Sequence, residues 1–223
     1  MENKELIVKN AREYVYDALN NEGSGHDWWH VFRVTNNAIE IAKYEEADIY
    51  ICELAALLHD IADGKLNESE EAGQKRVHTW LVDNGVSSET LDHVMDIVSK
   101  MSFKGGNQKE DVSTLEGKIV QDADRLDAMG AIGIARVMCY SGHVGRPIHD
   151  PAMKPRENLT LEEYRNGKDT AIMHFYEKLL KLKDTMNTSY ATKLAQGRHE
   201  FLIIVGRKSP YFSEGLDSPS LRQ

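Results

Sequence analysis

Apolar residues recur at intervals of three and four along most of the chain, which is the period of an amphipathic α-helix. The first such stretch, residues 4–20, carries Leu6, Val8, Ala11, Val15 and Leu19. The second follows Asp27, a residue type that caps helix N-termini, and carries Val31, Val34, Ala38 and Ile41. Period-two alternation and clusters of strand-forming residues are missing from the sequence. The pattern therefore predicts an all-α fold.

A third helix is predicted from Ile49, capped by Asp48, to about Ala62. Its residues 51–58 are apolar on almost every side, which is typical of a central helix that other helices cover. Two further helices are expected, one over about 68–84 that ends at Gly85, and one that starts after Ser88 and runs to about 103. The apolar core of the protein should lie around the third helix.

The segment Ser113–Glu116 has the sequence of a capping box, and the helix that it opens is expected to reach about Tyr140. Residues 141–168 are rich in Pro and Gly, and an irregular stretch of this length is often a lid. Helices follow over about 169–186 and 189–205. We expect a single domain, residues 1–205, with its motif core at about 25–131, a lid-like loop, C-terminal helices over 169–205, and a flexible tail over 206–223.

Composition narrows the class of protein. The chain has 223 residues, of which 41% are hydrophobic, so a core can form without disulfide or zinc support. Its two cysteines, Cys52 and Cys139, are expected to be inert thiols in a reducing compartment. The net charge of −9 without a basic stripe argues against a nucleic-acid polymer as ligand. Neither a signal peptide nor a membrane span is found, which favours a cytoplasmic protein; a homodimer stays open.

Four polar residues stand inside these apolar helices: His30, the pair His59-Asp60, and Asp124. Burying such groups without a partner costs several kcal/mol, on the order of 2–7 for a neutral polar group. Two imidazoles and two carboxylates that converge from three helices would form a mixed nitrogen and oxygen site for a divalent ion. With positions left open to water, such a site is typical of a hydrolase.

The alternative to metal ligation is that each of these four residues has a separate structural role. His30 would then bond a backbone carbonyl, and Asp124 would pair with Arg125 or Lys118. Arg125 follows Asp124 directly and points about 100° away on a helix, so it is a poor partner. Arg125 suits Asp122 better, as a solvated pair that leaves Asp124 facing the core. The other His-Asp pairs, at 26–27 and 149–150, are interpreted as a helix start and a loop. Metal ligation accounts for the whole set better than four unrelated roles.

The sequence resembles the HD-domain superfamily of metal-dependent phosphohydrolases in the order His, distant His-Asp, distant Asp. The matching segments are 25–34, 56–63 and 120–128, with 142–151 and 174–180 similar to a subgroup of small bacterial-type proteins. That subgroup contains nucleotide pyrophosphohydrolases and predicted phosphohydrolases. The resemblance covers about residues 5–200, and it implies a helical fold with His30, His59, Asp60 and Asp124 as metal ligands.

Further roles depend on the position of residues near this set. Asp63 resembles the family's acidic general acid/base, although it could equally be a turn residue beside Gly64. Asp127, one helical turn after Asp124, could orient a ligand or a water molecule. The cations that would bind phosphate are Lys65, Lys104 and Arg33, then Lys118 and Arg146; each could instead be a solvated charge. A second ion at His78 or His93 is conceivable, and Trp28 and Trp29 could stack a base or pack in the core.

The expected cofactor is one divalent ion, Mn²⁺ first, with Mg²⁺, Co²⁺ and Fe²⁺ as alternatives. The expected activity is hydrolysis of a small nucleotide, (d)NTP to (d)NMP and pyrophosphate. A 5′-nucleotidase is the alternative enzyme. Hydrolysis of alarmone nucleotides is disfavoured, because that branch has an acidic pair after His-Asp where this chain has Ala62-Asp63. A nucleotide or metal sensor without turnover is the alternative outside enzymes.

Overall fold

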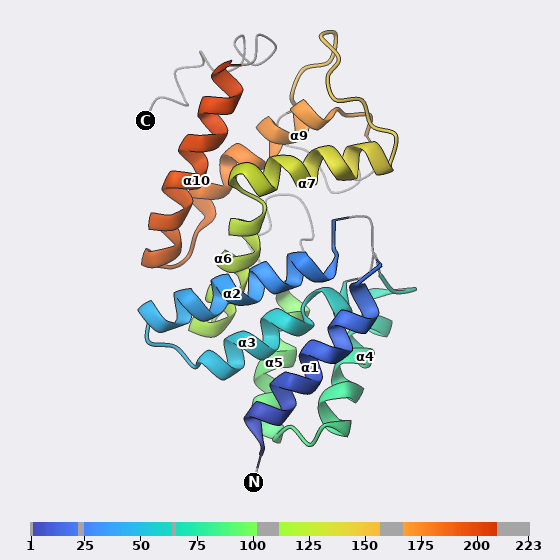
Figure 1. The fold of residues 1–223 in the computed structure, drawn as a ribbon, viewed down its shortest axis with the longest axis vertical. Helices are drawn as coiled ribbons and strands as arrows, with labels where there is room; N and C mark the ends of the chain where they lie inside the picture. The colour runs from blue at the N-terminus through green and yellow to red at the C-terminus, as the bar shows by residue number, and fades with distance from the viewer. Residues whose placement is uncertain (1, 22–24, 64–65, 102–111, 157–166, 209–223) are drawn as a thin grey trace. The chain divides into compact units, whose positions relative to one another are not determined.

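The computed structural model describes residues 2–21, 25–63, 66–101, 112–156 and 167–208. These residues form helices joined by turns, without a strand among them (Figure 1). The prediction of an all-α fold is confirmed. The chain divides into two compact units, residues 1–124 and 125–223.

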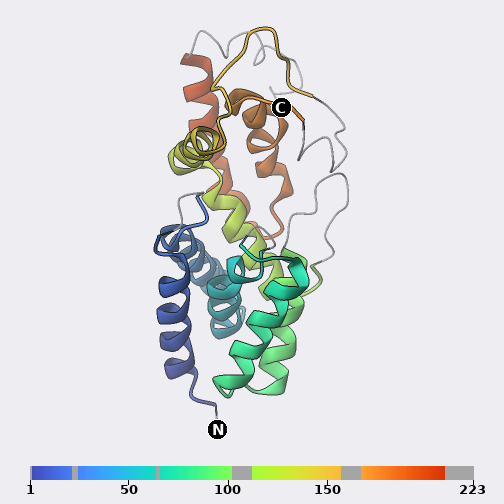
Figure 2. The ribbon, with the colours of Figure 1, turned by 90° about the vertical axis from the view of Figure 1, so that its right-hand side faces the viewer.

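The first unit is built around α3. Its helices are α1 (Lys4–Leu19), α2 (Trp28–Tyr44), α3 (Ile49–Leu58), η1 (Asp60–Ala62), α4 (Glu70–Asp83), α5 (Ser88–Met101) and α6 (Leu115–Asp127) up to Asp124. α3 packs against α1, α2 and α5, and α4 runs beside α5 (Figure 2). Leu54, Leu57 and Leu58 of α3 are fully buried. Each such leucine stabilises the fold by about 1.5–3 kcal/mol relative to an exposed one. The predicted central helix is confirmed.

Side chains fix the starts of α2 and α3 as the sequence predicts. The Asp27 carboxylate accepts a hydrogen bond from the backbone N–H of His30 at 2.8 Å. The Asp48 carboxylate accepts from the N–H groups of Tyr50 and Ile51 at 2.9 and 3.2 Å. The end of α3 differs from the prediction: the α-helix stops at Leu58, and residues 60–62 form a 3₁₀ turn.

Gly73 lets α4 approach that 3₁₀ turn closely. A Cβ atom at Gly73 would lie 2.5 Å from the carbonyl oxygen of Ala62, closer than non-bonded atoms can stand. Glycine weakens a helix interior by about 0.5–1 kcal/mol relative to alanine, so its presence in α4 has a packing reason. The contact holds η1, the segment that begins with Asp60, against α4.

Two boundaries near α6 differ from the prediction. Thr114, and not Ser113, caps α6, because its Oγ1 accepts from the N–H of Gly117 at 3.2 Å. Glu116 therefore does not complete a capping box; its carboxylate accepts from the N–H of Asp48 at 3.1 Å. The helix predicted to reach Tyr140 also breaks after residue 127. Gly130, the first residue of α7, has φ +67°, a left-handed conformation that glycine tolerates and that interrupts a continuous right-handed helix.

The second unit contains α7 (Gly130–His143), α9 (Ala171–Glu177), η2 (Leu179–Thr185) and α10 (Ser189–Lys208). α10 packs against α7 and η2, and α9 packs against η2. The helix predicted over 169–186 is thus α9 followed by a 3₁₀ segment. Most of the predicted tail, residues 209–223, lies outside the described residues.

The predicted lid is partly described. Arg146 forms an ion pair with Asp169, with 2.7 Å between Nε and Oδ1. The guanidinium of Arg156 donates to both oxygens of Glu177 at 3.0 Å, and its backbone N–H donates to the same carboxylate at 2.8 Å. These bonds tie the described parts of the loop to their own unit. Residues 157–166 lie outside the description, so a lid stays a prediction.

Candidate metal centre

The first turn of α2 places His30 in the interior. Because Asp27 caps the helix through the N–H of His30, the imidazole starts the buried face of α2 and is 1% exposed. Its Nε2 lies 3.4 Å from Oδ2 of Asp60 and 3.4 Å from Oδ1 of Asp124. One imidazole nitrogen therefore faces two carboxylates from different helices.

The change from α-helix to 3₁₀ turn places His59 and Asp60 side by side. Nδ1 of His59 lies 2.7 Å from the carbonyl oxygen of Ala56. A carbonyl can only accept, so Nδ1 carries the proton and Nε2 of the neutral ring has a free lone pair. That Nε2 is buried, makes no hydrogen bond within the described part of the chain, and lies 3.3 Å from Oδ1 of Asp60. A histidine with its second nitrogen fixed in this way is typical of a metal ligand.

Asp124 supplies the second carboxylate from α6, and its side chain is 40% exposed. A ring nitrogen of His30, a ring nitrogen of His59 and a carboxylate oxygen of Asp124 all lie within 4.8 Å of one another. The expectation that Asp122 is the solvated acid of α6 is wrong, because Asp122 is fully buried. Because Asp124 is partly exposed, the cluster is open to solvent on its side.

His26 joins the cluster although the sequence interpretation treated it as part of a helix start. Its Nδ1 lies 3.3 and 3.2 Å from the two oxygens of Asp60. With His30 and Asp60 it forms a second group whose ligand atoms lie within 4.8 Å of one another. His26 precedes the N-cap of α2 and is only half-buried, so the helical pattern gave no signal for it.

The histidines and carboxylates of the cluster stabilise one another's charged forms. Burial raises the pKa of Asp60, but the imidazoles of His59, His26 and His30 lower it by more, and the result lies well below the usual range. Burial lowers the pKa of His59, but the carboxylates of Asp60 and Asp124 outweigh it and raise the pKa above the ordinary value. In the absence of an ion, protons on the histidines stabilise the buried carboxylate.

Asp63 lies near these ligands, whereas Asp127 has a different neighbour. The charge of Asp63 contributes to the raised pKa of His59, and its backbone N–H donates to the carbonyl of Asp60 at 3.1 Å. Asp127 is buried, and its Oδ2 lies 3.1 Å from Nη1 of Arg136. Arg136 was not among the residues that the sequence singled out.

The structure describes some of the basic residues that were predicted to bind phosphate and not others. Arg33 is half-buried on α2, three residues after His30. Lys65 and Lys104 lie outside the described residues. Lys118 is half-buried on α6, and Arg146 bonds Asp169 in the second unit.

The histidines considered for a second ion lie apart from the cluster. Nε2 of His93 is 3.6 Å from Oε2 of Glu116, and Asp96 pairs with Lys100 at 2.5 Å. Neither His78 nor His93 belongs to a group of three or more potential ligands among the described residues. No second ion centre therefore forms around them in the described part of the structure.

Comparison with known proteins places this chain in a family. The model of the HD-domain family matches residues 28–129. YpgQ of Bacillus subtilis, an uncharacterised protein, is 39% identical over 95% of this chain and 96% of its own length. The crystal structure of YpgQ in complex with ADP matches with a TM-score of 0.73 and 37% identity, over 96% of this chain and 99% of that one.

Two other crystal structures are similar. A protein of Lactobacillus plantarum matches with a TM-score of 0.79 and 41% identity, over 90% of this chain and 93% of its own. An HD-superfamily hydrolase from Bacillus thuringiensis matches with a TM-score of 0.74 and 42% identity, over 97% of this chain and all of that one (100%). Among the residues described in the present structure, no helix has the length and apolar character to cross a membrane.

Proposed function

This chain belongs to the HD-domain superfamily of hydrolases, and from this premise we propose that it is a divalent-metal-dependent phosphohydrolase that converts a (deoxy)nucleoside triphosphate into the monophosphate and pyrophosphate. The observation that carries the proposal is that Nε2 of His30 lies within 3.4 Å of both Asp60 and Asp124 while Nε2 of His59 lies 3.3 Å from Asp60. The complex of YpgQ with ADP supports a nucleotide as the ligand class.

The residues of the cluster fit a divalent ion. His59 has a buried nitrogen lone pair that is held in place by the carbonyl of Ala56 and makes no hydrogen bond within the described residues. A set of two imidazoles and two carboxylates suits Mn²⁺, and also Fe²⁺, Co²⁺ or Mg²⁺, better than the sulfur-rich sites of structural zinc. When bound, such an ion supplies Lewis-acid polarisation of the phosphoryl group and makes the attacking water more acidic.

Side chains near the ion site would carry out the proton transfer and neutralise the phosphate charge. Water attacks the α-phosphorus, the bond to the α–β bridging oxygen breaks, and pyrophosphate leaves. Asp63 would take the proton of the attacking water at a carboxylate oxygen, since it lies close enough to His59 to affect its pKa. Arg33, near His30 on α2, would neutralise phosphate charge. Lys65 and Lys104 are proposed for the same role.

The test is a product assay with purified protein, Mn²⁺ and a panel of nucleoside mono-, di- and triphosphates. We expect pyrophosphate from triphosphates, and we expect Asp124→Asn to remove the activity. Asp83→Asn is the matched control, because Asp83 is an exposed acid at the end of α4 outside the cluster.

Two results would overturn the proposal. Release of orthophosphate from monophosphates alone would identify a 5′-nucleotidase. Binding of nucleotide in calorimetry without any product would identify a sensor.

A further inference from the structure

The two adjacent tryptophans at the start of α2 have different surroundings. Trp28 is half-buried, and its ring contacts Tyr16 of α1 edge-on, with 5.6 Å between centroids. Trp29 is 60% exposed. The prediction that these tryptophans pack in the core therefore suits Trp28 but is wrong for Trp29. Tryptophan is highly buried on average in folded proteins, so the exposure of Trp29 requires a reason.

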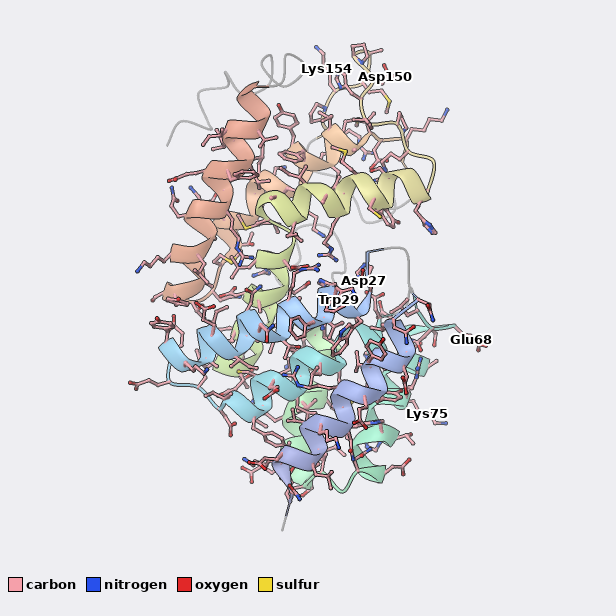
Figure 3. The ribbon with its side chains drawn as sticks, in the orientation of Figure 1. Asp27, Trp29, Glu68, Lys75, Asp150 and Lys154 are labelled. Atoms are coloured by element: carbon pink, nitrogen blue, oxygen red, sulfur yellow. The ribbon has the colours of Figure 1, made fainter. Side chains whose placement is uncertain are left out.

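Trp29 begins a row of side chains along α2 whose far end lies beside α6, the helix that carries Asp124. On a helix, residues four apart are surface neighbours, and Trp29, Arg33 and Asn37 follow that spacing along α2. The far end of the row contacts α6, because the amide of Asn37 donates to the carbonyl of Ala123 at 3.4 Å. Ala123 directly precedes Asp124. Figure 3 shows Trp29 at the N-terminal end of α2, close to Asp27.

One aromatic neighbour restricts the Trp29 ring without covering it. The Trp29 and Phe32 rings are 6.0 Å apart at an interplanar angle of 78°. An edge-to-face contact of this kind can cover at most one face of the Trp29 ring. The side chain as a whole is 60% exposed, so this contact leaves most of the ring uncovered. The indole is thus oriented in advance and has room for a flat ligand.

We propose that Trp29 is the platform on which the base of the substrate stacks. The inference rests on the proposed nucleotide hydrolysis and adds a specificity residue to it. The phosphates of a nucleotide would lie at His30 and Arg33, and its base would extend along α2 to the exposed indole. Stacking on an aromatic face accepts every base, because every base has a π-face. The site then requires a base while tolerating several kinds.

The test compares ADP with pyrophosphate, which has the phosphates but no base. Both are titrated by calorimetry into Mn²⁺-loaded wild type, Trp29→Ala and Trp29→Phe. We expect Trp29→Ala to weaken ADP binding about tenfold, the loss typical of one stacked base, and to leave pyrophosphate binding unchanged. Trp29→Phe should keep most of the ADP affinity. Tyr44→Ala is the matched control, since Tyr44 is an exposed aromatic at the other end of α2.

A fluorescence measurement gives an independent readout. In the Trp28→Phe, Trp80→Phe double variant, Trp29 is the remaining tryptophan of the three in the chain. ADP should quench its emission, and pyrophosphate should not.

Three outcomes would overturn the inference. Equal weakening of both ligands in Trp29→Ala would show a structural role for the indole. Unchanged ADP binding in Trp29→Ala, while wild type hydrolyses nucleotides, would reject stacking and leave the proposed function intact. Failure of wild type to bind ADP or to hydrolyse any nucleotide would reject both.

Discussion

The imidazole of His26 lies against the carboxylate of Asp60, with Nδ1 3.2 Å from Oδ2 and 3.3 Å from Oδ1. His26 stands before α2 and is 20% exposed, whereas Asp60 is buried at the start of η1. Asp60 thereby has an imidazole from His26, His30 and His59 within 3.4 Å. The position of its carboxylate is fixed from three directions.

This contact predicts a loss of metal affinity in His26→Ala. Residues that orient a metal ligand typically contribute 10–100-fold to affinity or activity, so we expect Mn²⁺ binding to weaken by about that factor. Calorimetry with Mn²⁺ measures it. His78→Ala is the control, because His78 is exposed on α4. Equal affinity in wild type and His26→Ala would show that the contact with Asp60 does not affect the ion.

The pKa shifts of the cluster predict opposite pH dependences with and without an ion. The raised pKa of His59 contributes stability to the metal-free protein that is fully present below about pH 6.5 and is lost as pH rises through the folded-state pKa. The lowered pKa of Asp60 contributes stability that is present above about pH 3.9 and is lost only as pH falls through its folded-state value. An ion needs neutral histidine, so its binding strengthens as pH rises.

Thermal unfolding at about pH 6 and about pH 8.5, with EDTA or with Mn²⁺, separates the two effects. Asp60 stays ionised between these values, so within the cluster the change comes from the histidines, of which His59 has the raised pKa. We expect the metal-free protein to lose stability towards the higher pH and the stabilisation by Mn²⁺ to increase. Greater stabilisation by Mn²⁺ at the lower pH would contradict the assignment of His59 as a ligand.

The close approach of α4 to η1 predicts that Gly73→Ala destabilises the protein. The added Cβ would meet the backbone oxygen of Ala62, which cannot move aside as a side chain can, and the expected cost is about 1–3 kcal/mol. Gly197→Ala is the matched control, because a Cβ at that position in α10 meets nothing within 4 Å. It should stabilise by roughly 0.5–1 kcal/mol. Urea unfolding of both variants measures the difference, and an equal effect would contradict the packing of η1.

The sequence predicts most of this fold because apolar spacing and caps are local signals. Asp27 and Asp48 cap the helices that the periodicity indicates, and α3 is central as its apolar run implies. The breaks after Asp127 and Glu177 were missed. At such points tertiary packing decides whether the backbone continues as a helix, and local propensity gives little warning.

The candidate site was predicted in part. His30, His59 and Asp60 could be recognised because they are polar residues in buried apolar segments. His26 is only half-buried and precedes its helix, so it lacked that signal. The prediction that Asp122 of α6 faces solvent was also wrong. A charged neighbour such as Arg125 can pair in several directions, so its position does not identify the solvent side of the helix. Contacts between distant segments decide these points.

Binding of Mn²⁺ by wild type and by Asp60→Asn, followed through the electron paramagnetic resonance signal of the free ion, tests the metal centre most directly. Circular dichroism first establishes that the variant is folded. We expect wild type to bind one Mn²⁺ per chain, and we expect Asp60→Asn to lose more than about 100-fold in affinity, beyond the loss typical of residues that only orient a ligand. Equal Mn²⁺ binding by the folded variant and by wild type would contradict the metal centre.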